Sequence, residues 1–197
     1  MLYLSLIMRV AKIIPILVIL IGITLFLYYS GRVQSIGVGS FKYSSDFTLL
    51  LPEHDAEAMN RVGFIPLCYE SDLQCLVLSG DKYYDTNFET AAISLNIDAE
   101  SKNMNDCMYS GEIYTELGTI TIGGVQFSVS SFGDGATGHT TGGNVYRTFH
   151  DETCYIISAG INLARYNEDV DMRRFGDTEY GEVMSRLESI VATFRFN

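Results

Sequence analysis

The sequence of 197 residues lacks the short motifs that identify many enzymes, and it contains no tryptophan and only three histidines. It has neither a Gly-x-Ser-x-Gly nucleophile elbow nor a Walker lysine, so two common hydrolase and nucleotide-binding signatures are missing. No two of His54, His139 and His150 have the spacing of paired metal ligands. The sequence therefore predicts no catalytic residue, no metal ligand and no cofactor.

The glycine-rich segment 133–144, which contains His139, is the part of the chain most similar to a phosphate-binding loop. It has no Walker lysine, and it stands between two predicted strands instead of opening a helix. His54 lies in the acidic stretch 52–57, where a carboxylate–histidine cluster could hold a divalent ion. We interpret both segments as solvated loops, because glycine, aspartate and serine or threonine are typical loop residues.

Basic residues are scarce, with 13 lysines and arginines against 24 acidic residues, and they are distributed unevenly. The chain has a net charge of −11, and residues 1–32 contribute +3, so residues 33–197 carry −14. An acidic domain of this kind repels the phosphates of nucleic acids and of anionic lipid headgroups. We therefore expect no nucleic-acid partner and no attachment of the domain itself to a membrane surface.

One long apolar run, Ile13–Tyr29, contains no charged residue. A helix of this length reaches roughly 26 Å, at about 1.5 Å per residue, which is close to the lower limit for crossing the hydrocarbon of a bilayer. Arg9 and Lys12 precede the run, and positive charges favour the cytoplasmic side. The pattern predicts a cytoplasmic N-terminus at residues 1–12, a single transmembrane anchor in the lipid bilayer at 13–29, and an extracytoplasmic domain at the cell membrane.

Two other interpretations of the apolar run stay open. A cleaved signal peptide needs small residues before the cut, but cleavage after Ser30 would put Tyr28 at the third position. A buried core helix would have a polar face, which this run lacks. Met8 is an alternative start to Met1. Beyond the run, the small and polar residues 30–40 predict a flexible tether.

All four cysteines follow the apolar run: Cys68, Cys75, Cys107 and Cys154. An even number of cysteines in an exported domain predicts two disulfides, and four cysteines allow three pairings. The turn signal Ser71-Asp72 lies midway between Cys68 and Cys75, so a hairpin folded there places these two cysteines opposite one another. We favour Cys68–Cys75 with Cys107–Cys154 as structural bridges over a zinc site, whose ligands come in more closely spaced pairs.

The remainder of the chain is rich in strand signals. In 87–98, for example, Ile93, Leu95 and Ile97 alternate with polar residues, which predicts a half-buried strand. Gly123-Gly124 has the form of a two-residue hairpin turn. Strands, some of them paired as hairpins, are predicted at 41–52, 87–98, 119–122, 125–131, 145–150 and 154–164. Residues between the strands, including 52–59 and 98–108, are expected to form loops or short helical turns.

The last segment changes from a strand period to a helical one. Apolar residues from Tyr180 to Phe194 recur every three or four positions, the spacing of one helical stripe, and Asp177 or Thr178 is expected to cap the helix. The fold class is therefore α+β. We predict a mostly antiparallel sheet of five to seven strands with the C-terminal amphipathic helix packed on one face, preceded by one N-terminal transmembrane helix.

The order of these elements resembles that of the PsbP-like α-β-α sandwich domains. The segments that carry the resemblance are FTLLLP at 47–52, TNFETAAISLNI at 86–97, YRTFHDETCYII at 146–157 and SIVATFRF at 189–196. The sequence is also similar to small anchored bacterial proteins with TNFE and YRTFH segments. The resemblance covers most of residues 41–197 and implies a PsbP-like α+β domain there. No residue set for the photosynthetic role of the plant members matches, so it implies the fold alone.

We expect a non-catalytic binding or assembly module displayed outside the cytoplasm, which acts through an extracytoplasmic protein partner or a small ligand. A shallow surface with an apolar or tyrosine-rich patch would favour this function. An exported hydrolase is one alternative, which a deep pocket with His139 or His150 beside a buried carboxylate would favour. A pilin-like subunit is another, although the Phe-Thr-Leu-Ile-Glu start typical of pilins is missing.

Overall fold

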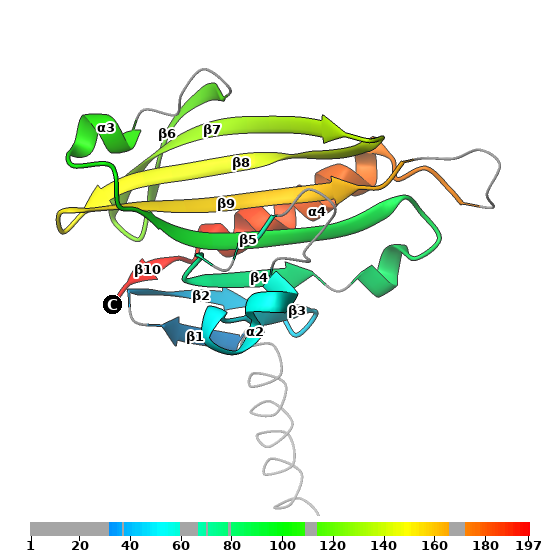
Figure 1. Cartoon of the computed structure of the whole chain (residues 1–197), viewed down its shortest axis with the longest axis horizontal. Helices are drawn as coiled ribbons and strands as arrows, with labels where there is room; N and C mark the ends of the chain where they lie inside the picture. Colours follow the sequence, from blue (N-terminus) through cyan, green and yellow to red (C-terminus); the bar gives the residue numbers. More distant parts are fainter. Residues whose placement is uncertain are drawn as a thin grey trace, which may run out of the picture. The chain divides into compact units, whose positions relative to one another are not determined.

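A seven-stranded antiparallel sheet, in the order β3-β4-β5-β9-β8-β7-β6, forms the centre of the structure (Figure 1). Its strands are β3 (Phe47–Leu50), β4 (Gln74–Leu78), β5 (Phe88–Asp98), β6 (Thr115–Ile122), β7 (Val125–Ala136), β8 (His139–His150) and β9 (Thr153–Leu163). The computed structural model describes residues 32–36, 38–59, 67–69, 71–78, 80–108, 114–165 and 172–197. The predicted α+β class and the mostly antiparallel sheet are confirmed.

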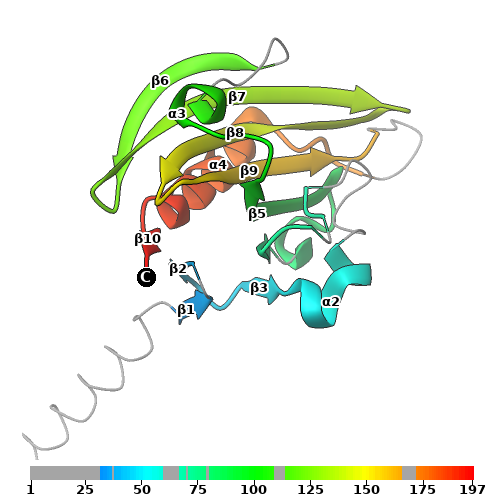
Figure 2. The same ribbon diagram turned by 60° about the vertical axis from the view of Figure 1, so that its left-hand side comes forward.

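Tight turns connect the last four strands into a meander. Gly123 and Gly124 join β6 to β7 as predicted, with φ values of 61° and 85°. Such left-handed pairs give the turn a twist that matches the flanking strands. Asp151 and Glu152 join β8 to β9, also as predicted, and both have positive φ although neither is glycine. Figure 2 shows the meander strands β6 and β7 arching at one end of the sheet.

The prediction of a loop at 133–144 is wrong. β7 continues to Ala136 and β8 begins at His139, so Thr137-Gly138 alone makes the turn. Glycine usually weakens a strand interior, and this made the segment look irregular. Here Gly133 and Gly142 pair across β7 and β8 in regular register.

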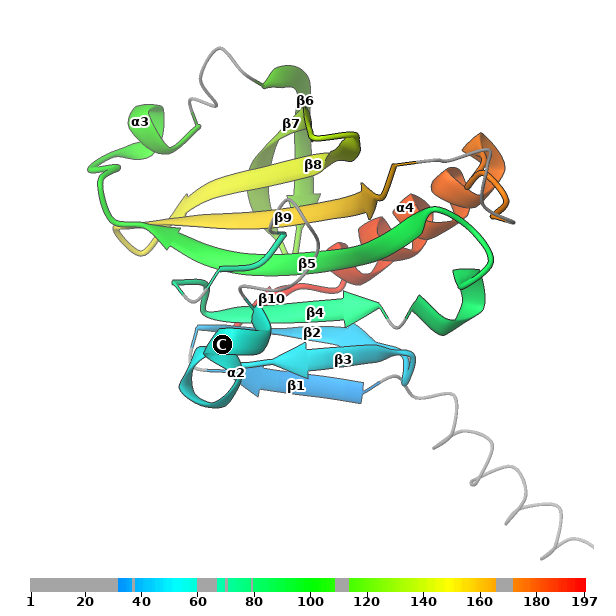
Figure 3. The same ribbon diagram turned by 45° about the vertical axis from the view of Figure 1, so that its right-hand side comes forward.

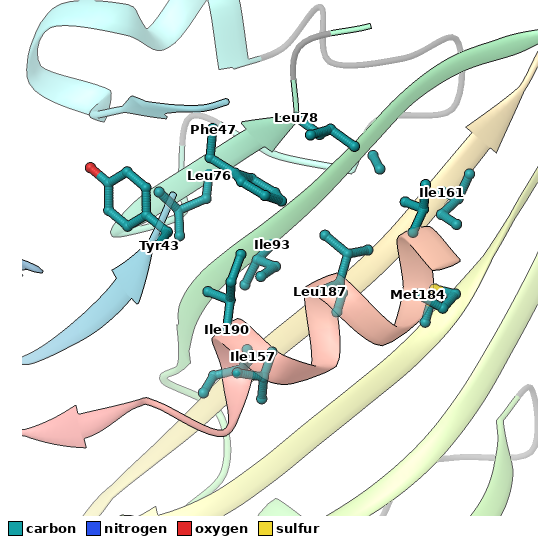
Figure 4. Close-up of a cluster of buried hydrophobic side chains, with 14 of the residues drawn as sticks. Tyr43, Phe47, Leu76, Leu78, Ile93, Ile157, Ile161, Met184, Leu187 and Ile190 are labelled. Atoms are coloured by element: carbon teal, nitrogen blue, oxygen red, sulfur yellow. The ribbon is translucent and has the colours of Figure 1, made fainter. Parts of the chain in front are cut away.

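Helix α4 (Asp177–Val191) packs on one face of the sheet, as predicted, and Figure 4 shows its side chains against those of the strands. Leu187 and Ile190 from the helix share a core with Ile93, Ile157 and other strand residues. The helix residues that become buried are Val183, Met184, Leu187, Ile190 and Val191. The predicted apolar stripe is thus the face that contacts the sheet.

The start of α4 differs from the prediction. Gly176, and not Asp177 or Thr178, is the residue that precedes the first turn. Glycine has no side chain to accept a hydrogen bond, but the Glu179 carboxylate reaches back and accepts the Gly176 N–H at 2.9 Å. This is the glutamate half of a capping box. Arg173 donates two hydrogen bonds of 2.8 Å to the same carboxylate, which holds the approach to the helix.

A second, three-stranded sheet has the order β1-β2-β10 and was not predicted (Figure 3). It contains β1 (Arg32–Ile36), β2 (Gly39–Tyr43) and β10 (Arg195–Phe196). The flexible tether expected at 30–40 is therefore wrong for the residues of β1 and β2. The strand or hairpin expected at 41–52 is instead two strands, β2 and β3, which belong to different sheets.

Three short helices complete the described elements: α2 (Pro52–Met59), the 3-10 helix η1 (Gly80–Tyr83) and α3 (Met104–Met108). Helix α2 is longer than the single turn expected there, and α3 is the predicted short helix that carries Cys107. The predictions for residues 1–12 and 13–29 lie outside the described residues. Within the part that is described, no helix has the length and apolar character needed to cross a membrane.

Candidate functional site

The seven-stranded sheet has a second face, opposite α4, and we call it the open face. Ile93 and Leu95 of β5 belong to the core shared with α4. Ser94 and Asn96 alternate with them and therefore point to the open face. The strand was predicted to be half-buried, but Ser94 is only 5% exposed. Other parts of the chain must therefore cover the open face at this point. Figure 1 looks onto this face, with α4 behind the strands.

Two disulfides attach covering segments to the open face, and they are the pairs predicted from the sequence. Cys68–Cys75 has a Cα–Cα distance of 6.0 Å, and Cys107–Cys154 has one of 5.5 Å. Cys75 pairs in register with Ser94, and Cys154 pairs with Asp98. Ser94 and Asp98 lie on the same side of β5, so both bridges start from the open face.

The first covering segment leads from α2 to β4 and builds a small second core. Met59, Leu67, Cys68, Cys75 and Ala92 are all buried in this cluster, and Phe132 packs against it. The turn predicted at Ser71-Asp72 is present, because the Asp72 N–H donates to the Tyr69 carbonyl at 2.9 Å. The predicted hairpin is not, because residues 67–69 do not form a strand.

A groove of about 410 Å³ runs along the open face beside this segment. Its volume lies in the range of small-molecule sites. The floor comes from the central strands β5, β7, β8 and β9, and the rim from residues 67–72 and Tyr114. The lining side chains are Leu67, Tyr69, Asp72, Ser94, Asn96, Tyr114, Phe132, Asp134, Thr141, Val145, Arg147, Ile156 and Ser158. We refer to this set as the groove.

Arg147 supplies the positive charge of the groove. Its guanidinium carbon lies 5.5 Å from the centre of the Tyr114 ring, within the range of a cation–π contact. Its Nε is buried and has no hydrogen-bond partner. Val145 and Arg147 share one side of β8 by strand alternation, so the cation stands directly beside apolar surface.

Asp72 is the buried carboxyl of the groove. It is 2% exposed, accepts the Tyr69 N–H at 2.8 Å and contacts the Ser94 hydroxyl. Burial raises the pKa of Asp72 from 3.8 to about 6, and the hydrogen bonds from Tyr69 and Ser94 offset part of the rise. The side chain therefore holds the turn of the covering segment against the sheet.

A larger hollow of about 800 Å³ lies next to α3, at the Cys107–Cys154 end of the open face. It is the more open of the two, and one of its two acidic residues, Asp98, is already engaged. Asp98 accepts a hydrogen bond of 2.8 Å from the Ser101 hydroxyl, which is the main reason that the pKa of Asp98 is lowered. We regard the groove as the better candidate site, because it combines half-buried aromatic groups with a cation whose Nε has no hydrogen-bond acceptor.

The histidines do not come together. His139 Nδ1 lies 3.3 Å from Glu89, and His150 Nε2 lies 3.6 Å from Asp151, which is 88% exposed. His54 is on α2. Neither His139 nor His150 lines the groove or the hollow at α3. Within the described ranges, no group of three or more histidine, cysteine, aspartate or glutamate side chains could hold a metal ion.

The glycine-rich segment does not form a phosphate-binding site of the dinucleotide type. Gly133, Gly135 and Gly138 have the Gly-x-Gly-x-x-Gly spacing, but that fingerprint needs a strand followed by a helix. Here the same residues run along β7 into a two-residue turn and on into β8. The segment predicted to be a flexible hairpin loop is therefore mostly strand.

The chain matches none of the known protein-family models, and no curated protein sequence is similar enough to indicate a family. The resemblance to PsbP-like domains therefore stays a prediction.

The groove was not predicted from the sequence. Its residues come from four strands and two separate rim segments, and no single stretch of sequence contains them. One signal was available in the run Val145–Phe149. Arg147 stands there on the same side of a strand as Val145 and Phe149, and a lone cation between apolar neighbours is unusual.

Proposed function

We propose that this protein is a non-catalytic binding module, carried outside the cytoplasm by the predicted anchor at 13–29, and that the groove binds a small ligand. The observation that carries the proposal is the combination of a 410 Å³ groove, aromatic rim residues Tyr69 and Tyr114, and the half-buried cation Arg147. Sites for small molecules are mostly apolar with a few well-placed polar groups, and the groove has this composition.

The architecture of the groove supports binding because its walls are rigidly attached. The floor strands are central in the sheet, and the rim segment is attached through Cys68–Cys75. A preorganised site loses less conformational entropy when a ligand binds. Disulfides persist in oxidising compartments, which supports the proposed extracytoplasmic location.

The hydrolase alternative has less support from the groove. Ser94 contacts Asp72, but Asp72 is almost completely buried and its carboxylate is engaged by the Tyr69 N–H. A general base must reach the proton that it removes. Asp72 serves the turn of the covering segment instead, and the histidine–carboxylate contacts of His139 and His150 lie outside the groove.

The proposal can be tested by a thermal-shift screen of the full chain in lipid nanodiscs against a library of small organic molecules. A true ligand at about 100 times its Kd should raise the Tm by about 5–10 °C. Replacing Ser158 by phenylalanine fills the floor of the groove and should abolish the shift. The exposed edge-strand variant Thr119→Phe adds the same ring away from the groove and should keep it. The proposal is wrong if no compound raises the Tm, or if every hit acts equally on Ser158→Phe.

A further inference from the structure

Arg147 lines the groove, and its buried Nε has no hydrogen-bond partner among the described residues. Among the described residues that line the groove it is the one basic side chain. Tyr114 covers one side of the guanidinium, and the buried Nε has no acceptor. A buried charged donor without an acceptor is costly, and nearly all such groups in native proteins have a partner. A ligand acceptor in the groove would give the guanidinium of Arg147 a hydrogen-bond partner.

Two carboxyl groups on the open face, Asp98 and Asp72, form hydrogen bonds to other groups. Asp98 acts on Arg147 through space, but one of its oxygens accepts the Ser101 hydroxyl at 2.8 Å. Asp72 is held by the Tyr69 N–H. Across the described ranges, no aspartate or glutamate forms an ion pair with Arg147. The cation is therefore available to an external anion.

Besides Asp72 and Arg147, the charged residue that lines the described part of the groove is Asp134. It lies at the end of the groove away from Arg147. It pairs with Thr141 in the β7–β8 register, and Arg147 is further along β8. The separation of their Cα atoms along the strands is about 20 Å, at about 3.4 Å per residue. This exceeds the Debye length of about 8 Å at physiological salt, so the exposed Asp134 opposes an anion at Arg147 only weakly.

The backbone of the floor offers nothing to a ligand. β8 and β9 are paired on both sides within the sheet, so a peptide cannot add to them as an extra strand. Recognition must come from side chains. These include Ile156, which pairs with Arg147 in register, and Val145 and Phe132, which lie between Arg147 and Asp134. Such a surface suits a ligand with an apolar body of drug-like size.

We propose that the groove binds a small organic carboxylate. Its carboxylate pairs with the guanidinium of Arg147, and its aliphatic or aromatic body lies on Val145, Ile156 and Phe132. Arginine suits this role because its planar guanidinium can donate two parallel hydrogen bonds to a carboxylate. This inference rests on the proposed binding function and adds the chemical class of the ligand.

Matched probes test the inference: 4-phenylbutyrate and its neutral analogue 4-phenylbutyramide. Their affinities are measured by isothermal titration calorimetry on the full chain in nanodiscs, with empty nanodiscs as the blank. We expect the acid to bind at least about tenfold more tightly than the amide, as one charge-assisted hydrogen bond predicts. Arg147→Ala should remove this preference, so that the acid and the amide bind with equal affinity. Arg174→Ala, which removes an exposed arginine outside the groove, should change neither affinity.

The variant Arg147→Lys provides a second test that does not depend on tolerance of the alanine change. It keeps the charge but loses the paired donors, so the preference for the acid should fall and not vanish. The inference is overturned if wild type binds acid and amide equally, if it binds neither, or if the preference survives in Arg147→Ala. If wild type binds the acid and the amide equally, and Ser158→Phe abolishes the binding of both, the proposed binding function still holds. Failure of the library screen would overturn that function as well.

Discussion

Cys75 and Cys154 lie on the same face of the seven-stranded sheet, and each holds a different covering segment against it. Cys75 binds the segment that forms the groove rim, whereas Cys154 binds α3 at the other end of the open face. The two bridges close loops of very different length, with sequence separations of 7 and 47 residues. Their contributions to stability and to binding should therefore differ.

Removing the two bridges one at a time should separate these contributions. In the chain-entropy account, loss of Cys107–Cys154 lowers the free energy of unfolding by about 4 kcal/mol, and loss of Cys68–Cys75 by about 2.5 kcal/mol. Urea unfolding of two variants, one with both cysteines of Cys107–Cys154 replaced by serine and one with both cysteines of Cys68–Cys75 replaced, measures the two losses of free energy. Ligand binding should follow the reverse order, because Cys68–Cys75 positions Leu67, Tyr69 and Asp72. If the variant without Cys107–Cys154 loses more affinity, the assignment of the rim is incorrect.

The close approach of β8 and β9 at Gly143 predicts a strong effect of one methyl group. Gly143 pairs with Gly160, and a Cβ at position 143 would overlap the Ala159 carbonyl oxygen. Because that oxygen belongs to a central strand and cannot move aside, Gly143→Ala should destabilise the protein by about 3 kcal/mol. Thermal unfolding measures the change.

Gly181 provides the matched control for this substitution. It lies inside α4, it is exposed, and nothing stands within 4 Å of a Cβ placed there. Gly181→Ala should stabilise the protein by about 1 kcal/mol, because alanine favours a helix interior over glycine. Equal stability of the two alanine variants would contradict the packing described for β8 and β9.

The raised pKa of Asp72 predicts a pH dependence of stability with a definite sign. Its pKa is about 6 in the folded protein against 3.8 in the unfolded chain, so the folded state binds the proton more tightly. The contribution of Asp72 to stability is therefore present below pH 4, and it is lost as the pH rises through 6. A rise of about two pKa units corresponds to on the order of 3 kcal/mol.

Asp72→Asn isolates this effect, because asparagine can still accept the Tyr69 N–H but does not titrate. The difference in unfolding free energy, wild type minus variant, should decrease between pH 4 and pH 6.5 and then stay constant. Urea unfolding at several pH values measures it. A difference that increases with pH would show that Asp72 is stabilised as the anion, contrary to the burial seen here.

Much of the fold could be predicted because its signals are local. The Gly123-Gly124 turn, the helical stripe from Tyr180 onward and the disulfide pairing each follow from neighbouring residues or from a short turn between them. The glycine-rich strands could not be predicted, because glycine weakens an isolated strand. Only the tertiary structure shows why glycine is needed in these strands. Gly143 and Gly160 lie where neighbouring strands and side chains leave no room for a Cβ atom.

The site was harder to predict than the fold, for a physical reason. The groove exists only when β5, β8 and β9 lie side by side and the disulfide-bonded rim covers Ser94. Because apolar and polar residues alternate in β5, Ser94 and Asn96 were predicted to lie on its polar side. That side was expected to face solvent. Nothing within β5 indicates that Arg147 and Tyr114, distant in sequence, stand beside it.

The most direct test of the central claim, that the groove binds a small organic carboxylate, uses the absence of tryptophan from the chain. Tyr114→Trp places a single fluorophore beside Arg147 and preserves an aromatic ring for the cation–π contact. Tyr84→Trp places one at a position that is 87% exposed and outside the groove. Titration with 4-phenylbutyrate should change the emission of Tyr114→Trp saturably and leave Tyr84→Trp unchanged. No change in the first variant, or the same change in both, would contradict the account.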